Sequence, residues 1–196
     1  NHILQGEYVD TFRKNLEILD SIKTLKDFSE NYKSLVLKHI PTPISLSVDT
    51  DMKNTKQRLV YIQGASVILP DASYYRPEMA AQKEQILSIW TNTTKMVMAK
   101  TNLSPEDQEK YVSDALAFDE ILAGLVKTNE EWSRYVEMYN PMGTEEVVSM
   151  ISTVDFGHIL SSLFGYVPSI VVVAEPRYFA DFDKVLNNET LELYKH

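Results

Sequence analysis

The sequence contains no cysteine. Disulfide bonds, thiolate metal ligands and cysteine nucleophiles are therefore excluded within these 196 residues. Glycine and proline are scarce, with six and eight residues, which argues against a disordered or low-complexity chain. The longest apolar run, Ile170–Ala174, is far shorter than a bilayer-spanning helix requires, so we expect no membrane-spanning segment in this chain.

Basic residues are also few. The chain has 19 lysines and arginines against 28 aspartates and glutamates, and its net charge is -9. This balance disfavours nucleic acid or an anionic membrane surface as a partner. The first residues lack the basic region and apolar stretch of a signal peptide, which favours a cytoplasmic location, with export or cell-surface display as the alternative.

The four histidines do not have the spacing of a helix-borne zinc site. Such a site needs two histidines four residues apart, with a glutamate directly after the first. None of His2, His39, His158 and His196 meets either condition, so we predict no metal ligand in this chain. We expect His39 to close a helix, where a cation suits the helix dipole, and His158 to form a local charge pair with Asp155 one turn before it.

No catalytic residue is predicted either. Neighbouring acidic residues point to different faces of a helix, so the three acidic pairs are interpreted as solvated surface or helix-start charge rather than as acid-base pairs. These pairs are Asp119-Glu120, Glu130-Glu131 and Glu145-Glu146. Ser66 and Ser161-Ser162 lack the motif of an activated serine, and the chain has no glycine-rich phosphate loop.

Most of the sequence has helical periodicity. We expect helices at about Glu7–Leu19, Leu25–His39, Tyr75–Lys100, Ser104–Leu125, a short one from Thr128, and Thr144–Met150, Asp155–Phe164, Glu175–Leu186 and Glu189–His196. Thr24, Ser104 and Thr128 have the pattern of capping residues at helix starts. Thr144 and Asn188 are assigned the same role.

The remaining pattern indicates β-structure. Apolar and polar residues alternate over Ile44–Val48, and Arg58–Ile62 follows after a polar connection, which together predict an antiparallel hairpin over about Ile44–Ile62. Ser169–Val173 is β-branched and predicts either a short strand or a buried extended segment. The predicted fold class is mainly α: one partial domain over residues 1–196, a multi-helix lobe with one small hairpin.

Four blocks carry a resemblance to a known family. They are Val48–Asn54, the Leu-Pro-Asp-x-x-Tyr-Tyr block Leu69–Tyr75, a block from Ala117–Ala123 to Arg134 and Tyr139–Met142, and Val171–Phe179. In this order they resemble the N-terminal, non-catalytic half of the neprilysin-like zinc metalloendopeptidases, in particular the bacterial endopeptidase O branch. Asp119 stands where that family usually has glutamate, which places in doubt any salt bridge at that position.

The resemblance implies a helical lid that admits oligopeptides to a chamber closed by a thermolysin-like catalytic lobe. It implies zinc in the parent protein, with ligands outside this chain, and a fragment that is inactive alone. The implied partners are peptide substrates and the catalytic lobe of the same polypeptide, with no substrate-binding residue assigned here. One hydroxyl of Tyr74 or Tyr75 could face the chamber or the lobe interface, although a core tyrosine beside a surface one is the simpler interpretation. The alternative function is a self-contained helical protein-binding module without enzymatic activity.

Overall fold

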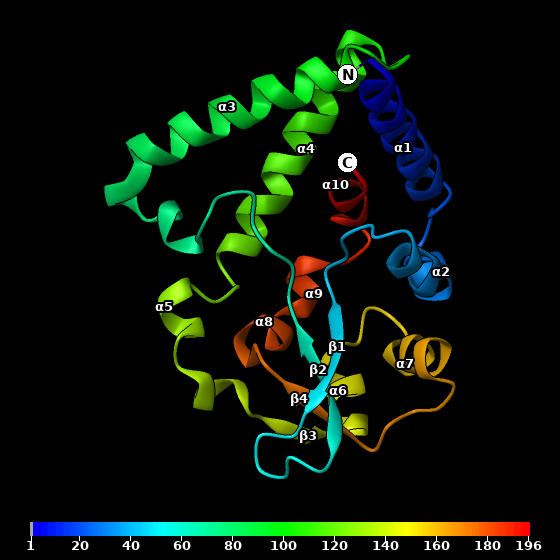
Figure 1. The fold of residues 1–196 in the computed structure, drawn as a ribbon, viewed down its shortest axis with the longest axis vertical. Helices are drawn as coiled ribbons and strands as arrows, with labels where there is room; N and C mark the ends of the chain where they lie inside the picture. The colour runs from blue at the N-terminus through cyan, green and yellow to red at the C-terminus, as the bar shows by residue number, and fades with distance from the viewer. Residues whose placement is uncertain (1) are drawn as a thin grey trace.

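Long helices form one end of the molecule and a small sheet lies at the other. The computed structural model describes the backbone of residues 2–196 and the side chains of residues 6–196. Figure 1 shows the long helices α1 (His2–Asp20), α3 (Ala80–Met98) and α4 (Pro105–Ala123) at the end where both termini lie. The shorter helices are α2 (Leu25–Leu37), α5 (Asn129–Trp132), α6 (Thr144–Met150), α7 (Phe156–Phe164), α8 (Pro176–Ala180), α9 (Phe182–Val185) and α10 (Leu191–Lys195). The predicted mainly α fold is confirmed.

The sheet has four strands in the order β1-β2-β4-β3. Strands β1 (Ser45–Thr50) and β2 (Arg58–Gln63) form the predicted antiparallel hairpin. The β-branched segment is strand β4 (Ile170–Val173), which lies parallel to β2. β3 (Pro141–Gly143) pairs antiparallel to β4 at the sheet edge, where a proline is tolerated because its missing N–H faces away from the ladder. Its three residues show no alternation, so the sequence did not predict it.

Three of the predicted helix caps are present. The Asp27 N–H donates to Thr24 Oγ1 at 3.1 Å, and the Asp27 carboxylate accepts from the Thr24 N–H in return. Thr128 and Glu131 make the same reciprocal pair at α5. Ser104 accepts from the N–H three residues on, at the start of α4. Each satisfies backbone donors that the first helical turn leaves without partners.

The predicted cap at Thr144 is wrong. Thr144 is the first residue of α6, Gly143 precedes it, and no side chain caps this end. The Thr144 hydroxyl instead donates to the Pro168 carbonyl in the segment before β4. Its partner lies far along the chain, so the spacing at the helix start could not predict this contact.

The predicted cap at Asn188 is also wrong. Helix α10 begins after Thr190, and the preceding turn is held by Asn187, whose Oδ1 accepts from the Glu189 and Thr190 N–H groups at 2.8 and 2.9 Å. An asparagine that bonds backbone two and three residues on forms a turn, so the capping chemistry is displaced by one position.

Two predicted helices are interrupted. In place of one helix from Tyr75, the chain makes two 3₁₀ turns, η1 (Ala72–Tyr75) and η2 (Pro77–Met79), before α3 begins. Arg76 has an extended ψ of 146° because the proline after it disfavours helical backbone. The helix predicted over Glu175–Leu186 divides into α8 and α9 at Asp181. Among the described helices, none has the length and apolar character needed to cross a membrane.

The core lies between one face of the sheet and the helices around it. Alternate residues of the two central strands, Val60 and Ile62 with Val171 and Val173, contribute the sheet face. Aromatic side chains from the helices cover it, including Phe28, Phe156, Phe179, Phe182 and Tyr178.

Tyr178 is fully buried, and its hydroxyl donates to the Pro43 carbonyl at 2.6 Å. Its ring lies against Gly64, the residue after β2. A Cβ at Gly64 would stand 2.8 to 2.9 Å from three atoms of this ring, closer than side chains pack. Gly64 is therefore required by close packing.

We expect Gly64→Ala to destabilise the protein by about 1–3 kcal/mol, because the added methyl group must displace a buried ring that is held by a hydrogen bond. Urea unfolding measures the change. Gly124→Ala is the matched control: Gly124 has helical backbone, and a Cβ there meets only the Ile121 carbonyl oxygen at 3.7 Å. Equal unfolding free energies for the two variants would contradict the packing argument.

Candidate functional site

A pocket of about 300 Å³ lies where three segments distant in sequence meet. Its walls come from the loop after β2, from the chain that runs from the end of α4 through α5 to Met138, and from Glu175 just after β4. We call it the loop pocket. The Leu69–Tyr75 block contributes one wall and the Val171–Phe179 block another, so tertiary structure brings two of the four sequence blocks together here.

Glu175 joins two walls of the loop pocket. Its side chain is buried, with Oε1 accepting from the Gly64 N–H at 2.8 Å and Oε2 accepting from the Lys127 N–H at 2.9 Å. Burial raises the pKa of Glu175, and these two hydrogen bonds partly offset that rise. Both carboxylate oxygens are occupied by backbone donors, so the carboxylate connects loops.

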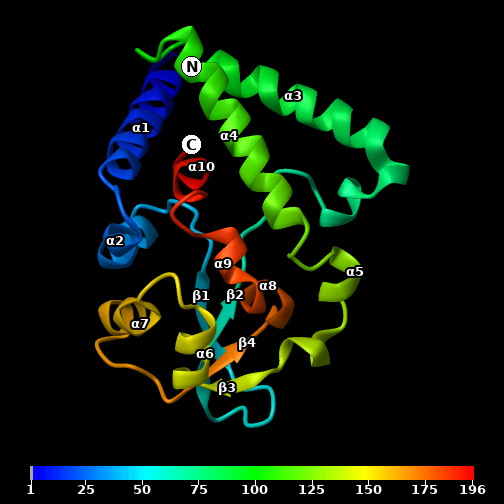
Figure 2. The same cartoon turned by 180° about the vertical axis from the view of Figure 1, so that it is seen from behind.

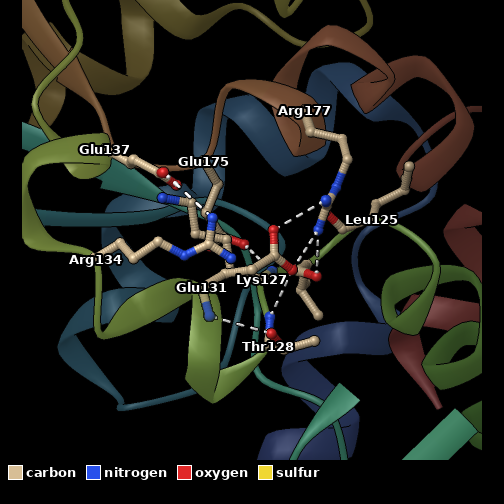
Figure 3. A network of polar contacts seen from close by, with 9 residues as sticks. Leu125, Lys127, Thr128, Glu131, Arg134, Glu137, Glu175 and Arg177 are labelled. Atoms are coloured by element: carbon tan, nitrogen blue, oxygen red, sulfur yellow. Dashed lines mark hydrogen bonds and ion pairs between the residues drawn. The ribbon is translucent and has the colours of Figure 1, made fainter. Parts of the chain in front are cut away.

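Arg177 forms a second connection beside it (Figure 3). Its Nη1 and Nη2 donate to the two oxygens of Glu131 at 3.1 and 3.2 Å, which is the bidentate geometry that guanidinium and carboxylate favour. Nε and Nη2 also donate to the carbonyls of Leu125 and Val126 at the end of α4. The Arg177 guanidinium therefore lowers the pKa of Glu131 and binds α8 to α5 and to the chain between α4 and α5. In the same network, Arg134 and Glu137 pair at 3.3 Å, with both side chains about half exposed.

Two buried charged atoms near these loops have no hydrogen-bond partner among the described residues. One is Lys127 Nζ, which lies 5.1 Å from the centre of the Trp132 ring in the pocket wall. The other is Oδ2 of Asp119, whose Oδ1 accepts from the Ile68 N–H at 2.7 Å. Burial raises the pKa of Asp119. Within the part of the chain that the structure describes, Asp119 makes no ion pair, so its contact is a backbone hydrogen bond to the loop before η1.

The histidines lie apart from this pocket. His39 follows α2 in left-handed backbone with φ 57°. The predicted charge pair of His158 is wrong: the contact is a backbone one, in which the His158 N–H donates to Asp155 Oδ1 at 3.0 Å and caps α7. The side chain of His2 lies outside the described residues.

His196 has an environment that no sequence pattern indicated. Its ring stacks on Tyr111 with centroids 4.0 Å apart, and Nδ1 lies 2.7 Å from Asp114 Oδ2. Among the described residues, no three histidines or carboxylates come together in a group that could hold a metal ion. The side chains of residues 6–196 therefore provide no donor set that fits zinc.

The prediction that the acidic pairs are solvated surface or helix-start charge is wrong for Asp119, which is buried within α4 and accepts a backbone hydrogen bond. It is confirmed for Glu145 and Glu146, which are exposed in the first turn of α6. Asp119 is buried and Glu120 exposed, and Glu131 binds Arg177 while Glu130 is exposed. Tyr74 and Tyr75 do not divide into a core and a surface residue, because both are half-buried. Lys83 Nζ lies 5.2 Å over the Tyr75 ring.

Comparison with known proteins agrees with the fold and with the four blocks. The sequence profile described as peptidase family M13 matches residues 5–196. A neutral endopeptidase of Lactococcus lactis subsp. cremoris is 32% identical over 184 residues, which cover 93% of this chain and 29% of the relative. A neutral endopeptidase of Lactobacillus helveticus is 32% identical over 171 residues, which cover 87% of this chain and 26% of the relative.

Solved structures give the same result. PepO from Lactobacillus rhamnosis HN001 matches with a TM-score of 0.81 and 25% identity, covering 95% of this chain and 30% of that one. The zinc metalloprotease Zmp1 of Mycobacterium tuberculosis, solved with an inhibitor, has the same fold over 95% of this chain, with a TM-score of 0.78 and 21% identity.

The chain belongs to peptidase family M13. It spans less than a third of the length of the curated relatives it matches.

We expect Glu175→Gln to lower the free energy of unfolding by about 2 kcal/mol. The amide has one acceptor oxygen, so either the Gly64 or the Lys127 N–H loses its partner in a buried position and faces an NH₂ group. Urea unfolding at neutral pH measures this. Glu189→Gln, at an exposed position, should change the free energy by less than about 0.5 kcal/mol. A loss no larger than that of this control would show that the two hydrogen bonds do not hold the loops.

We expect Glu131→Gln to lower stability by about 1 kcal/mol at pH 7, a value limited by the half-exposed Arg177. The folded-state pKa of Glu131 is lowered, so its ion pair is fully stabilising above the unfolded pKa and is lost as pH falls through the folded value. The difference between wild type and variant should therefore shrink on acidification. Unfolding measured at several pH values tests this, with the exposed Glu130→Gln as control. A difference that stays constant with pH would contradict the assignment.

Proposed function

We propose that residues 1–196 form the substrate-access lobe of a zinc-dependent metalloendopeptidase that hydrolyses oligopeptides. The observation that carries this proposal is the family M13 match over residues 5–196, combined with coverage of less than a third of the relatives' length. The rest of such a parent would supply the catalytic lobe.

The use of the charged groups supports a non-catalytic role for this part. A catalytic acid or base needs a free position from which to reach substrate. At the loop pocket both oxygens of Glu175 accept backbone N–H groups, and Glu131 is bound bidentately by Arg177. These carboxylates hold in place the segments that surround the loop pocket.

Zinc belongs to this proposal only as a group of the parent protein. The described residues offer no set of ligands that fits it, so we assign its ligands to residues outside this chain. We also propose peptides as the substrates, the catalytic lobe of the same polypeptide as the partner, and a cytoplasmic location.

The test is an assay of the whole gene product on short peptides and on a folded protein, with and without a metal chelator. We expect chelator-sensitive cleavage of the peptides, little cleavage of the folded protein, and no activity from residues 1–196 alone. A whole gene product that cleaves no peptide in a chelator-sensitive way would contradict the proposal and leave the helical binding module as the explanation. Rapid cleavage of the folded protein would contradict the access role.

A further inference from the structure

Helix α3 contains several large apolar residues but buries almost none of them against the rest of the described chain. Of its 19 residues only Met98, the last, is buried. The helix packs against α4 near its C-terminal end and against η1 and η2 near its N-terminal end. Both views show it extending away from the body between these contacts (Figures 1 and 2).

The apolar residues of α3 cover more than one side of it. Ile86, Trp90 and Val97 share the half-buried face, whereas Ile89 and Met96 are 62% and 70% exposed. Ile89 and Met96 are seven residues apart, which is two helical turns, so they lie on one outward stripe. Large apolar side chains that recur along one exposed stripe are typical of a surface that contacts another segment or protein.

The polar residues on the same stripe are uncharged. Gln85 and Asn92 flank Ile89, and together with Ile89 and Met96 they make up what we call the α3 outer face. Helix α4 has the same length and carries seven charged residues, whereas α3 carries only Lys83, Glu84 and Lys95. A solvated helix face normally carries charge, and an interface core is depleted of it.

The charge and the size of the α3 outer face indicate which kind of surface contacts it. A helix lying on a membrane surface carries many lysines and arginines on the face opposite its apolar one, whereas the whole of α3 has only Lys83 and Lys95 and no arginine. A helix of this length offers a strip of roughly 30 by 10 Å, about 300 Å², whereas a stable interface between two proteins buries about 800 Å² on each partner. A strip this small suits a segment of the same polypeptide, which docks at high effective concentration without the cost of bringing two molecules together.

We propose that the α3 outer face is the docking surface for an apolar, charge-poor helix from another part of the same polypeptide, outside residues 1–196. The proposal rests on the proposed function in one respect, namely that a large part of the parent protein lies outside this chain. Residues 1–196 cover only 29% of the Lactococcus relative, so a parent of similar length has ample chain to supply that helix.

The test uses the full-length parent protein with a photo-crosslinking amino acid placed at Ile89 or at Met96. We expect each to give a high yield of cross-links within one molecule, to residues outside 1–196, identified by peptide mass spectrometry. The matched control is the same amino acid at Ser113, an exposed position on α4, the charge-rich helix of equal length. The Ser113 position should give a several-fold lower yield of these cross-links.

Three outcomes would overturn the proposal: cross-links that join two molecules, cross-links confined to residues 1–196, and yields no higher than at Ser113. The cross-link is scored without any reference to activity. A parent that lacks chelator-sensitive cleavage but cross-links as expected would refute the proposed function and support the docking surface. A parent that shows chelator-sensitive cleavage but no such cross-link would support the proposed function and refute the docking surface.

Discussion

The buried carboxylate of Glu175 is the contact on which the arrangement of this protein depends. It stands where the central parallel strand β4 ends and binds one backbone N–H from the loop after β2 and another from the chain after α4. A buried carboxylate is costly unless donors surround it, and here the two donors come from two loops that are distant from each other in sequence. Loss of either donor would leave one buried carboxylate oxygen without a hydrogen-bond partner, so Glu175 couples the positions of the three segments.

The neighbouring contacts extend the same principle. Arg177 follows Glu175 by two residues and binds Glu131 and two carbonyls at the end of α4, while Asp119 binds the loop before η1. Polar side chains thus fix irregular segments whose backbone groups the sheet and the helices cannot satisfy. In this family M13 chain, the carboxylates of Glu175 and Glu131 and the guanidinium of Arg177 therefore connect the segments in and around the loop pocket.

The packing is unequal across the molecule. Around the sheet, residues such as Ile62, Val171 and Phe156 are fully buried, whereas the longest helices at the other end bury few residues. The chain spans under a third of its relatives' length, and this contrast is expected when part of the apolar surface belongs to contacts with the remainder of a larger protein.

Local signals in the sequence determined the helix starts at Thr24, Ser104 and Thr128, the hairpin and the mainly α class, because caps and alternation act between residues a few positions apart. The four ordered blocks likewise indicated the family. Only the tertiary structure decided that Pro141–Gly143 would be an edge strand, that Thr144 would bind Pro168, and that Glu175 would join Gly64 to Lys127. Those contacts link residues up to 111 positions apart, and no pattern within a short window of sequence carries information about them.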